Sequence, residues 1–343
     1  MIDYNLLKEI IDKLPDDKII LLGGHQNTDY DSIGSVYALT LFLNKIGKKA
    51  FMLLEEKDIP KLDWFGNTEF IISNIEINDN YNFILLDSNR KSRLGIFESY
   101  FDNADITINI DHHENNSMEA NYIFVDKDIS STSEIIFNLI NLYNKIDKDI
   151  ATLLYAGIAS DTNSFYRRVT SNTMRVASNL LKYNIDSTNI IKNVCKNITL
   201  EETKILSDML SNIKYSSFHY IVMDRNNPLY KDVDYNILFK KLASIIYDIE
   251  EIKLIGLFLI ELDGSVSGIL RSNCEIDVDK LAISLGGGGH KKASGFENNM
   301  DINEVLDFVK YIQKNNRNFT IVLYCLFRFF ICFYNSFNKF IST

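Results

Sequence analysis

Three side chains that commonly bind divalent metals lie within seven residues near the start of the chain. They are His25, Asp29 and Asp31, in the stretch "LLGGHQNTDYDSIGS" (21–35), which follows a short apolar run and leads into an apolar helical pattern. Two carboxylates and an imidazole contribute nothing to a hydrophobic core. Their types match the oxygen and nitrogen ligands that suit Mn²⁺ and similar first-row ions. This segment therefore predicts part of a metal site at the end of a strand.

Acidic or imidazole groups also follow three other apolar runs. Asp87 follows "NFILL", the triplet Asp111, His112 and His113 follows "ITINI", and Asp161 follows "LLYAGIAS". In open parallel sheets, ligands bind outside the carboxyl ends of the strands, where side chains that are distant in sequence meet. Treating all four positions as strand ends, we expect them to converge on one site.

The number of these groups indicates two ions rather than one. Six carboxylate or imidazole ligands exceed what one ion needs beside its waters, and the absence of thiolates disfavours a structural zinc site. Two ions about 3.5–4 Å apart that share a bridging carboxylate activate water at neutral pH and stabilise the attacking and leaving oxygens of a phosphoryl transfer. We predict Mn²⁺, with Mg²⁺ or Co²⁺ as substitutes.

Each position has an ordinary structural explanation when it is taken alone. Asp31 could be a helix N-cap, Asp87 a turn residue, and the adjacent His112 and His113 a surface feature. However, four of the five histidines fall in acidic or glycine-rich clusters, and only His219 lies in an ordinary strand pattern. That coincidence favours a shared site.

The pattern of apolar residues predicts an α/β fold. Apolar runs that suit buried parallel strands alternate with helical patterns through the N-terminal half. We therefore expect a mostly parallel sheet with helices on both faces. The predicted strands are 18–24, 49–56, 81–88 and 105–113, and the predicted helices are 4–14, 31–46 and about 133–163.

A second, smaller α/β unit is expected after a helical connector. Strand-like runs return from residue 213, followed by a short helix "DVDKLAIS" and the glycine run "LGGGGHKKASGF". The expected organisation is a metal-binding catalytic domain at 1–185, a helical linker at 186–212, a substrate-binding domain at 213–316, and an atypical hydrophobic tail at 317–343.

The glycine run suggests an anion site in this second unit. Glycines let backbone N–H groups approach an anion closely, although a run of glycines alone is more often a flexible turn. Arg271, on a preceding strand, offers a planar fork that suits bidentate phosphate binding, and its alternative is an ordinary surface arginine. The candidate phosphate-binding residues are Arg271, Gly287, Gly288, Gly289 and His290.

Length and composition limit the class of protein. A chain of 343 residues suffices for two domains, and 46% hydrophobic with 24% charged residues is ordinary for a soluble globular protein. The net charge of −10 argues against broad binding of long nucleic acids but is compatible with a small anionic substrate held near a metal. The four cysteines lack paired spacing and the chain opens without a positively charged leader, which favours a cytoplasmic location.

The last residues differ sharply in composition from the rest. Segment 319–343 contains nine aromatic residues and no acidic one. Its apolar run, 319–334, is broken by Arg328 and is shorter than the roughly 20 residues needed to span a bilayer. The alternatives are an interfacial membrane anchor, an element packed on the second domain, or an extension foreign to the enzyme. We favour a non-catalytic extension over membrane contact.

Together, these segments resemble the signatures of the DHH phosphoesterases. "HQNTDYDSIGS", "LLDSNRKSRLG", "NIDHHENN" and "GIASDTNSF" resemble the four motifs of that family in order, and "GILRSNCEIDVDKLAISLGGGGHKKASGF" resembles the accompanying DHHA1 domain. The match covers about residues 5–315. Thr28, Tyr30 and Asn163 depart from the residues that many relatives carry there, but none of them is a ligand. The two-domain length is most similar to the bacterial nanoRNase/pAp-phosphatase branch, because RecJ-type exonucleases are usually longer and family II pyrophosphatases carry a different second domain.

The resemblance implies a role for individual residues. One Mn²⁺ would be held by His25, Asp29 and Asp87. The other would be held by Asp31, Asp87, His112 and Asp161, so that Asp87 bridges the two ions. His113 would face the scissile phosphate as an acid or electrostatic stabiliser. The phosphate or nucleotide would be bound by Arg271, glycines 286–289 and His290.

The implied activity is Mn²⁺-dependent hydrolysis of very short RNAs to mononucleotides, of 3′-phosphoadenosine 5′-phosphate (pAp) to AMP, or of both. One alternative is a phosphodiesterase for linear or cyclic dinucleotides (pApA or c-di-AMP) in nucleotide signalling. Another is a catalytically silent nucleotide-binding module, which the intact ligand set opposes. The expected partner is short RNA or a small nucleotide rather than a long duplex, and a homodimer is a reasonable expectation. The sequence does not choose among these substrates.

Overall fold

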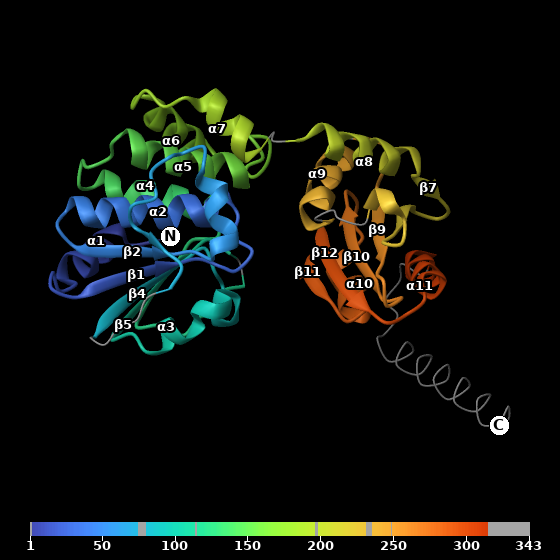
Figure 1. Ribbon diagram of the computed structural model, residues 1–343, viewed down its shortest axis with the longest axis horizontal. Coiled ribbons are helices and arrows are strands. Elements are labelled where there is room, and N and C mark those ends of the chain that lie inside the picture. The colour runs from blue at the N-terminus through green and yellow to red at the C-terminus, as the bar shows by residue number, and fades with distance from the viewer. Residues whose placement is uncertain are drawn as a thin grey trace. The chain divides into compact units, whose positions relative to one another are not determined.

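The computed structural model of the chain describes residues 2–74, 80–113, 115–195, 198–230, 235–247 and 249–314. The chain divides into two compact units, Met1–Asn197 and Ile198–Thr343 (Figure 1). This boundary falls inside the segment expected to connect two domains. The hydrophobic tail predicted at 317–343 lies outside the described residues. Within the described ranges, no helix combines the length and the apolarity that crossing a bilayer requires.

The first unit is built on a six-stranded parallel sheet in which the strand order reverses beside β1. The order is β3-β2-β1-β4-β5-β6, so the chain runs outward from β1 to β3 and then returns to the other side of β1. In an open α/β sheet, ligands usually bind in the crevice outside the carboxyl ends of the two strands between which the order reverses, here β1 and β4. The strands are β1 (Ile19–Gly23), β2 (Lys49–Leu53), β3 (Ile71–Ile72), β4 (Tyr81–Leu86), β5 (Ile106–Asp111) and β6 (Tyr122–Val125).

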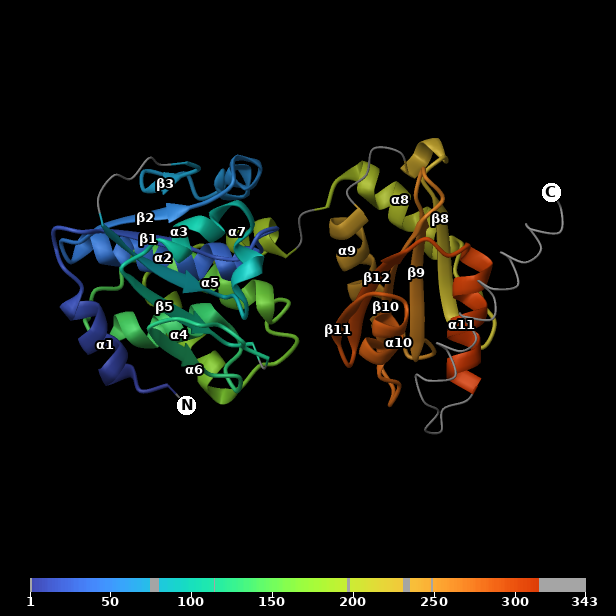
Figure 2. The ribbon, with the colours of Figure 1, turned by 90° about the horizontal axis from the view of Figure 1, so that it is seen from below.

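Helices cover both faces of this sheet, which confirms the predicted fold class (Figures 1 and 2). Alternate residues of β1 and β4, such as Ile20 and Ile84, pack against α2, α4 and α5, while Leu21 and Phe83 pack against η2 and α3. Burial on both faces explains why these strands are continuous apolar runs. The helices are α1 (Tyr4–Lys13), α2 (Tyr30–Lys45), η1 (Glu56–Leu62), η2 (Lys91–Phe97), α3 (Glu98–Asp102), α4 (Thr132–Asn141), α5 (Lys148–Asp161), α6 (Ser171–Leu181) and α7 (Ser187–Val194).

Small residues let α2 and α5 approach closely. A Cβ atom added to Gly34 of α2 would lie 2.5 Å from the carbonyl oxygen of Leu153 in α5, a separation that real atoms do not adopt. Gly47, with φ of 90°, follows the end of α2 as the sequence predicts. The predicted helix at 133–163 is in fact two helices, α4 and α5, because the chain turns between Asn141 and Lys148.

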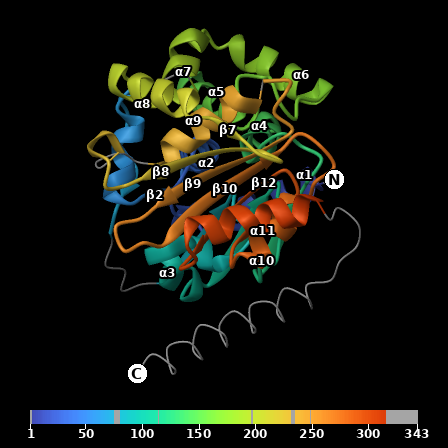
Figure 3. The ribbon, with the colours of Figure 1, turned by 90° about the vertical axis from the view of Figure 1, so that its right-hand side faces the viewer.

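The second unit contains a mixed sheet of order β11-β12-β10-β9-β8-β7, in which only β8 and β9 pair in parallel. Helices α8 and α9 pack on one face and α10 and α11 on the other (Figure 3). The sequence analysis left α9 and α11 unassigned. The elements are α8 (Leu200–Ser211), β7 (Lys214–Tyr215), β8 (His219–Asp224), η3 (Pro228–Tyr230), α9 (Tyr235–Tyr247), β9 (Leu254–Ile260), β10 (Val266–Ser272), α10 (Val278–Ser284), β11 (Gly288–His290), β12 (Ala293–Asn298) and α11 (Ile302–Lys314).

The chain leaves α5 through a strained turn. Asn163, Ser164 and Phe165 have φ angles of 49°, 60° and 66°, in the left-handed region that costs residues other than glycine about 1–2 kcal/mol each. The buried Thr162 holds the turn, because its hydroxyl donates to the carbonyl of Ile158 at 2.6 Å and accepts the N–H of Phe165 at 3.0 Å. Strain of this kind is often retained beside functional sites, and this turn directly follows the end of α5.

Replacing Ser164 by glycine should stabilise the protein. Its φ suits glycine, and its buried hydroxyl has no hydrogen-bond partner among the described residues. We expect Ser164→Gly to raise the free energy of unfolding by about 0.5–1 kcal/mol, measured by urea denaturation. The control Ser160→Gly, inside α5, should lower it by a similar amount. An equal loss of stability in both variants would show that the turn is not strained.

Candidate metal centre

The carboxyl ends of three strands and the end of one helix bring the predicted ligands together. His25, Asp29 and Asp31 follow β1, Asp87 follows β4, and His112 and His113 follow β5. Asp161 was expected at the end of a strand, but it is the last residue of α5. Three overlapping groups have ligand atoms within 4.8 Å of one another, and these groups are His25–Asp29–Asp87, Asp87–His112–His113 and Asp31–His112–Asp161.

Asp87 lies at the centre of the cluster and faces both halves of it. Its Oδ2 atom is 3.6 Å from Nε2 of His25, and its Oδ1 atom is 3.5 Å from Nε2 of His112. The hydroxyl of Thr132 also donates to Oδ1 at 3.0 Å. Asp87 has a φ of 56°, so the backbone turns sharply where β4 ends and the carboxylate stands beyond the sheet edge. Each oxygen of one carboxylate is therefore directed to a different group of ligands.

The separations within the cluster suit ligands around cations better than direct hydrogen bonds. Nε2 of His112 is 3.3 Å from Oδ2 of Asp161 and 4.0 Å from Oδ2 of Asp31, and Nε2 of His25 is 3.7 Å from Oδ2 of Asp29. Most N–H···O bonds are about 2.7–3.2 Å long. Two ligands that are each about 2.1 Å from one ion lie roughly 3–4 Å apart. The donor types and their spacing thus fit divalent ions.

Asp29, rather than Asp31, is the N-cap of α2. Its Oδ1 atom accepts the N–H groups of Asp31 and Ser32, both at 3.2 Å, which leaves Oδ2 directed to His25. The same carboxylate therefore ends the helix and joins the cluster. An N-cap carboxylate commonly stabilises a helix by about 1 kcal/mol, so Asp29 has a structural role beside its expected ligand role.

Asp31 is fully buried and is held by the N-terminus of α4. Its Oδ2 atom accepts the N–H of Thr132 at 2.7 Å and its Oδ1 atom accepts that of Ser133 at 2.9 Å. The unpaired N–H groups at the start of a helix favour negative charge. Gly157 of α5 allows this approach, because a Cβ there would lie 2.0 Å from Oγ of Ser133 and 2.9 Å from Oδ1 of Asp31. Thr132 and Ser133 were not predicted, because they donate through their backbone N–H groups and such donors cannot be recognised from the residue type.

Hydrogen bonds orient two of the imidazoles. Nδ1 of His25 lies 2.9 Å from the carbonyl oxygen of Gln26 and must donate to it, so Nε2 is the atom that faces the cluster and can bind an ion once it has lost its proton. Nδ1 of His113 lies 2.6 Å from Oδ1 of Asp111, whose Oδ2 accepts a bond from Nδ2 of Asn116 at 2.8 Å. The sequence analysis noted Asp111 without assigning it a role, and it missed Asn116. Asp111 orients His113 as the carboxylate of a catalytic triad orients its histidine.

The cluster concentrates more negative charge than its imidazoles neutralise. Burial, followed by repulsion from Asp87, raises the pKa of Asp31 to about 7. Burial, followed by repulsion from Asp31, raises the pKa of Asp161 well above its ordinary value. Burial alone would lower the pKa of His25 and His112, but the neighbouring carboxylates outweigh it and raise both to about 10. Burial likewise opposes ionisation of Asp87, yet the two protonated imidazoles beside it hold its pKa below the ordinary range.

The cluster is open on one side. The side chains of Asp31 and Asp87 are 0% and 3% exposed, whereas those of Asp29, Asp161 and His113 are 39%, 22% and 22% exposed. His113 is therefore one of three cluster residues that a ligand can contact from solvent.

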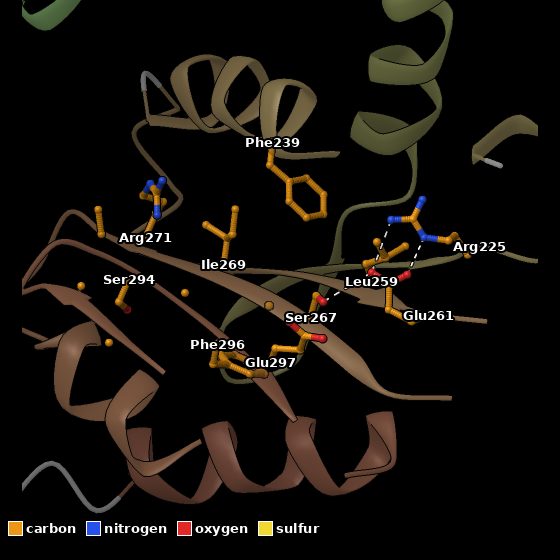
Figure 4. A pocket seen from close by; sticks show the side chains of 15 residues that line it. Arg225, Phe239, Leu259, Glu261, Ser267, Ile269, Arg271, Ser294, Phe296 and Glu297 are labelled. Carbon is orange, nitrogen blue, oxygen red and sulfur yellow. Dashed lines mark hydrogen bonds and ion pairs between the residues drawn. The ribbon is translucent and has the colours of Figure 1, made fainter. Parts of the chain in front are cut away.

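A cavity of about 680 Å³ in the second unit contains part of the predicted phosphate site (Figure 4). Arg271, Gly288 and Gly289 line it, while Gly287 does not. The side chain of His290, which was also predicted to bind phosphate, lies outside the described part of the structure. The cavity has a volume typical of small-molecule sites.

The glycine run allows close packing rather than supplying a row of free N–H groups. The N–H of Gly287 donates to the carbonyl of Ala282 at 2.8 Å, and the N–H of Gly289 donates to Oδ1 of Asp279 at 2.7 Å. A Cβ added to Gly287 would lie 2.0 Å from the carbonyl oxygen of Gly295 in β12. Glycine is required here because the chain approaches β12 too closely for a side chain, and these two N–H groups already have partners within the chain.

Two family models match this chain. The model of the DHH family, N-terminal domain, matches residues 19–158, and the model of the DHHA1 domain matches residues 217–315. The first match includes every predicted metal ligand except Asp161. The second match includes the cavity residues of the second unit.

Several proteins of known name or structure are similar over most of the chain. The probable bifunctional oligoribonuclease and PAP phosphatase NrnA of Streptococcus mutans is 26% identical over 84% of this chain and 92% of its own. The bifunctional oligoribonuclease and PAP phosphatase NrnA of Thermus thermophilus is 26% identical over 80% of this chain and 83% of its own. The structure of an exopolyphosphatase-related protein from Bacteroides fragilis matches with a TM-score of 0.79 and 21% identity, over 91% of this chain and 95% of that one.

Replacing Asp87 by asparagine should abolish the binding of paired ions. Asparagine keeps the size of the side chain and tolerates a positive φ, so the fold should persist in a far-UV circular dichroism spectrum. We expect the affinity for Mn²⁺, measured by isothermal titration calorimetry, to fall by more than about 100-fold because the shared carboxylate is lost. The control Asp105→Asn, which removes a surface partner of Lys18, should bind Mn²⁺ normally. Unchanged stoichiometry in Asp87→Asn would show that Asp87 does not bridge ions.

Binding of Mn²⁺ should release protons. Without metal, His25 and His112 are protonated at pH 7 and Asp31 is partly protonated, and ions must displace these protons to reach the ligand atoms. The apparent affinity should therefore rise between pH 6 and pH 8, by about tenfold per pH unit for each proton released. Calorimetry in two buffers of different ionisation enthalpy measures the protons directly. An affinity that is independent of pH, without proton release, would contradict the proposed electrostatics.

Proposed function

Because the chain belongs to the DHH family and carries a DHHA1 domain after its DHH domain, we propose that it is a two-metal phosphoesterase acting on very short RNAs and on pAp. The two domains and the named relatives make it a hydrolase of phosphoester bonds. What we propose beyond this is the choice of substrate, the identity of the metal and the number of ions.

The proposal rests on one observation. The candidate ligands form two groups, one on each side of the Asp87 carboxylate. His25 and Asp29 lie on the side of its Oδ2 atom, while His112 lies on the side of its Oδ1 atom with Asp31 and Asp161 beside it. One ion would be held by His25, Asp29 and Asp87, and the other by Asp31, Asp87, His112 and Asp161. A module that only binds nucleotides has no need of such an arrangement.

The donor set favours Mn²⁺, because it combines carboxylates with imidazoles and contains no thiolate. When bound, two such ions acidify a water ligand and neutralise the charge that develops on a phosphate. We propose Mg²⁺ and Co²⁺ as substitutes. Asp31 and Asp161, the carboxylates with raised pKa values, are the groups that gain most from a nearby cation.

His113 is the residue that can act on the substrate directly. Its Nδ1 atom is bound to Asp111, so Nε2 is the atom available to a phosphate at the open side of the cluster. From there it can donate a hydrogen bond to a phosphate oxygen or a proton to the leaving oxygen. Asp111 is buried, which alone would raise its pKa, but the hydrogen bond and charge of His113, together with the hydrogen bond from Asn116, hold that pKa below its ordinary value. Asp111 therefore accepts the hydrogen bond of His113 as a carboxylate.

A small substrate is supported by charge and by the cavity of the second unit. The net charge of −10 disfavours long nucleic acids, whose affinity depends on many cationic contacts. The cavity of about 680 Å³ suits one nucleotide, and Arg271 supplies a guanidinium for its phosphate. Both curated relatives are named for activity on oligoribonucleotides and PAP.

A substrate panel tests the proposal. The full chain with Mn²⁺ should hydrolyse RNA 2–5-mers and pAp with kcat/KM at least about tenfold above that for cyclic dinucleotides and for long RNA. The net charge disfavours long RNA, and a cyclic dinucleotide lacks the terminal phosphate that Arg271 would bind. Chelation by EDTA should abolish the activity, and Mn²⁺ should restore it. A preference for cyclic dinucleotides would instead assign the enzyme to nucleotide signalling, and no hydrolysis of any substrate would support a silent binding module.

A further inference from the structure

The cavity of the second unit has two chemically different ends (Figure 4). Arg271 lies at one end, and the ion pair between Arg225 and Glu261 lies at the other. Between them, the ring of Phe239 from α9 points toward Ile269 of β10. One cavity thus joins a cationic end, an apolar middle and an end that contains a carboxylate.

The register of the sheet fixes the order of these parts. Ser267, Ile269 and Arg271 alternate onto the same face of β10, and the four-residue step from the first to the last spans about 13 Å. Ser267 is paired with Glu297 of β12, which also lines the cavity, and its hydroxyl lies 3.4 Å from Oε1 of Glu261. Both glutamates therefore lie beside Ser267, at the far end of the cavity from Arg271.

This distribution of charge orients an anionic ligand. At the far end, two carboxylates face one guanidinium, which gives a formal charge of −1, while Arg271 contributes +1 at its own end. A phosphate is therefore attracted to Arg271 and repelled from Glu261 and Glu297. A nucleotide bound by its phosphate at Arg271 must direct its base toward the apolar middle and the far end.

The middle of the cavity suits a flat ring. Phe239 is buried in the core between α8, α9 and the sheet, and it still lines the cavity together with Leu259 and Ile269. Stacking of a base on an aromatic side chain contributes about 1–3 kcal/mol and tolerates any base. Discrimination among bases must therefore come from the polar groups that meet the edge of the ring, and Glu261 lies at that position.

Glu261 is held in place yet keeps hydrogen-bonding capacity. Nε of Arg225 donates to its Oε2 atom and Nη2 donates to its Oε1 atom at 3.4 Å, which fixes the plane of the carboxylate. A carboxylate oxygen accepts about two hydrogen bonds, so Oε2 has room for another donor. The side chains of Arg225 and Glu261 are 27% and 23% exposed, so the pair is held in place but remains partly accessible.

We propose that Glu261 accepts a hydrogen bond from the exocyclic amino group of a bound base, so that the cavity favours adenine and cytosine over uracil. Adenine and cytosine present an amino donor on that edge, whereas uracil presents a carbonyl oxygen, as thymine does. A carbonyl oxygen facing a carboxylate is repelled. The inference rests on the proposed function and adds a base preference to it.

The test compares 5′-phosphorylated dinucleotides on the full chain with Mn²⁺. We expect kcat/KM for pApA and pCpC to exceed that for pUpU by about tenfold. Glu261→Gln should reduce this ratio severalfold, because an amide can also donate to the uracil carbonyl. Ser267→Ala, which removes the hydroxyl beside Oε1 of Glu261, is a second variant in case Glu261→Gln folds poorly, and it should shift the ratio in the same direction.

A matched control and a measurement without catalysis separate the outcomes. Glu202→Gln removes a carboxylate of the same unit that pairs with Lys241 outside the cavity, and it should leave the ratio unchanged. Calorimetric titration with AMP, CMP and UMP measures the base preference even when nothing is hydrolysed. AMP binding about tenfold tighter than UMP without any hydrolysis would support the base contact and contradict the proposed activity. Equal affinities for AMP and UMP, or a ratio that neither variant alters, would overturn the inference.

Discussion

Negative charge gathered around one carboxylate is the constraint on which the first unit depends. Asp29, Asp31 and Asp161 lie with Asp87 at the carboxyl edge of a parallel sheet, and the three imidazoles of the cluster cannot neutralise all four carboxylates. Buried like charges of this kind either keep protons or hold cations. The raised pKa values of Asp31 and Asp161 show the first state, and the spacing of the ligand atoms fits the second. Metal binding is therefore the simplest explanation of why the fold tolerates the cluster.

Backbone features of the first unit hold these carboxylates in place. The reversal of strand order beside β1 opens the crevice, the N-terminus of α4 donates two N–H groups to Asp31, and Asp29 ends α2 while it faces His25. The backbone is strained at two places beside the site. These are Asp87, with its positive φ, and the left-handed turn after α5. Strain and helix ends thus position side chains that would otherwise repel one another.

Much of this could be predicted from the sequence, for physical reasons. Strands buried on both faces are continuous apolar runs, so β1, β4 and β5 were predicted, and the candidate ligands that follow them lie close together as expected. Asp161 was singled out by the apolar run before it and treated as a strand end, although the helical pattern over 133–163 includes it, because an apolar run does not distinguish a strand from a buried helix. The backbone donors of Thr132 and Ser133, the packing role of Gly287, and the pairing of Arg225 with Glu261 depend on contacts between distant segments. No pattern of residue types records them.

The most direct measurement is an anomalous difference map from a crystal of the full chain soaked in manganese chloride. The account predicts two manganese peaks, roughly 3.5–4 Å apart, with the carboxylate of Asp87 between them. A map without manganese in the first unit, or with a single ion that Asp87 does not contact, would contradict it.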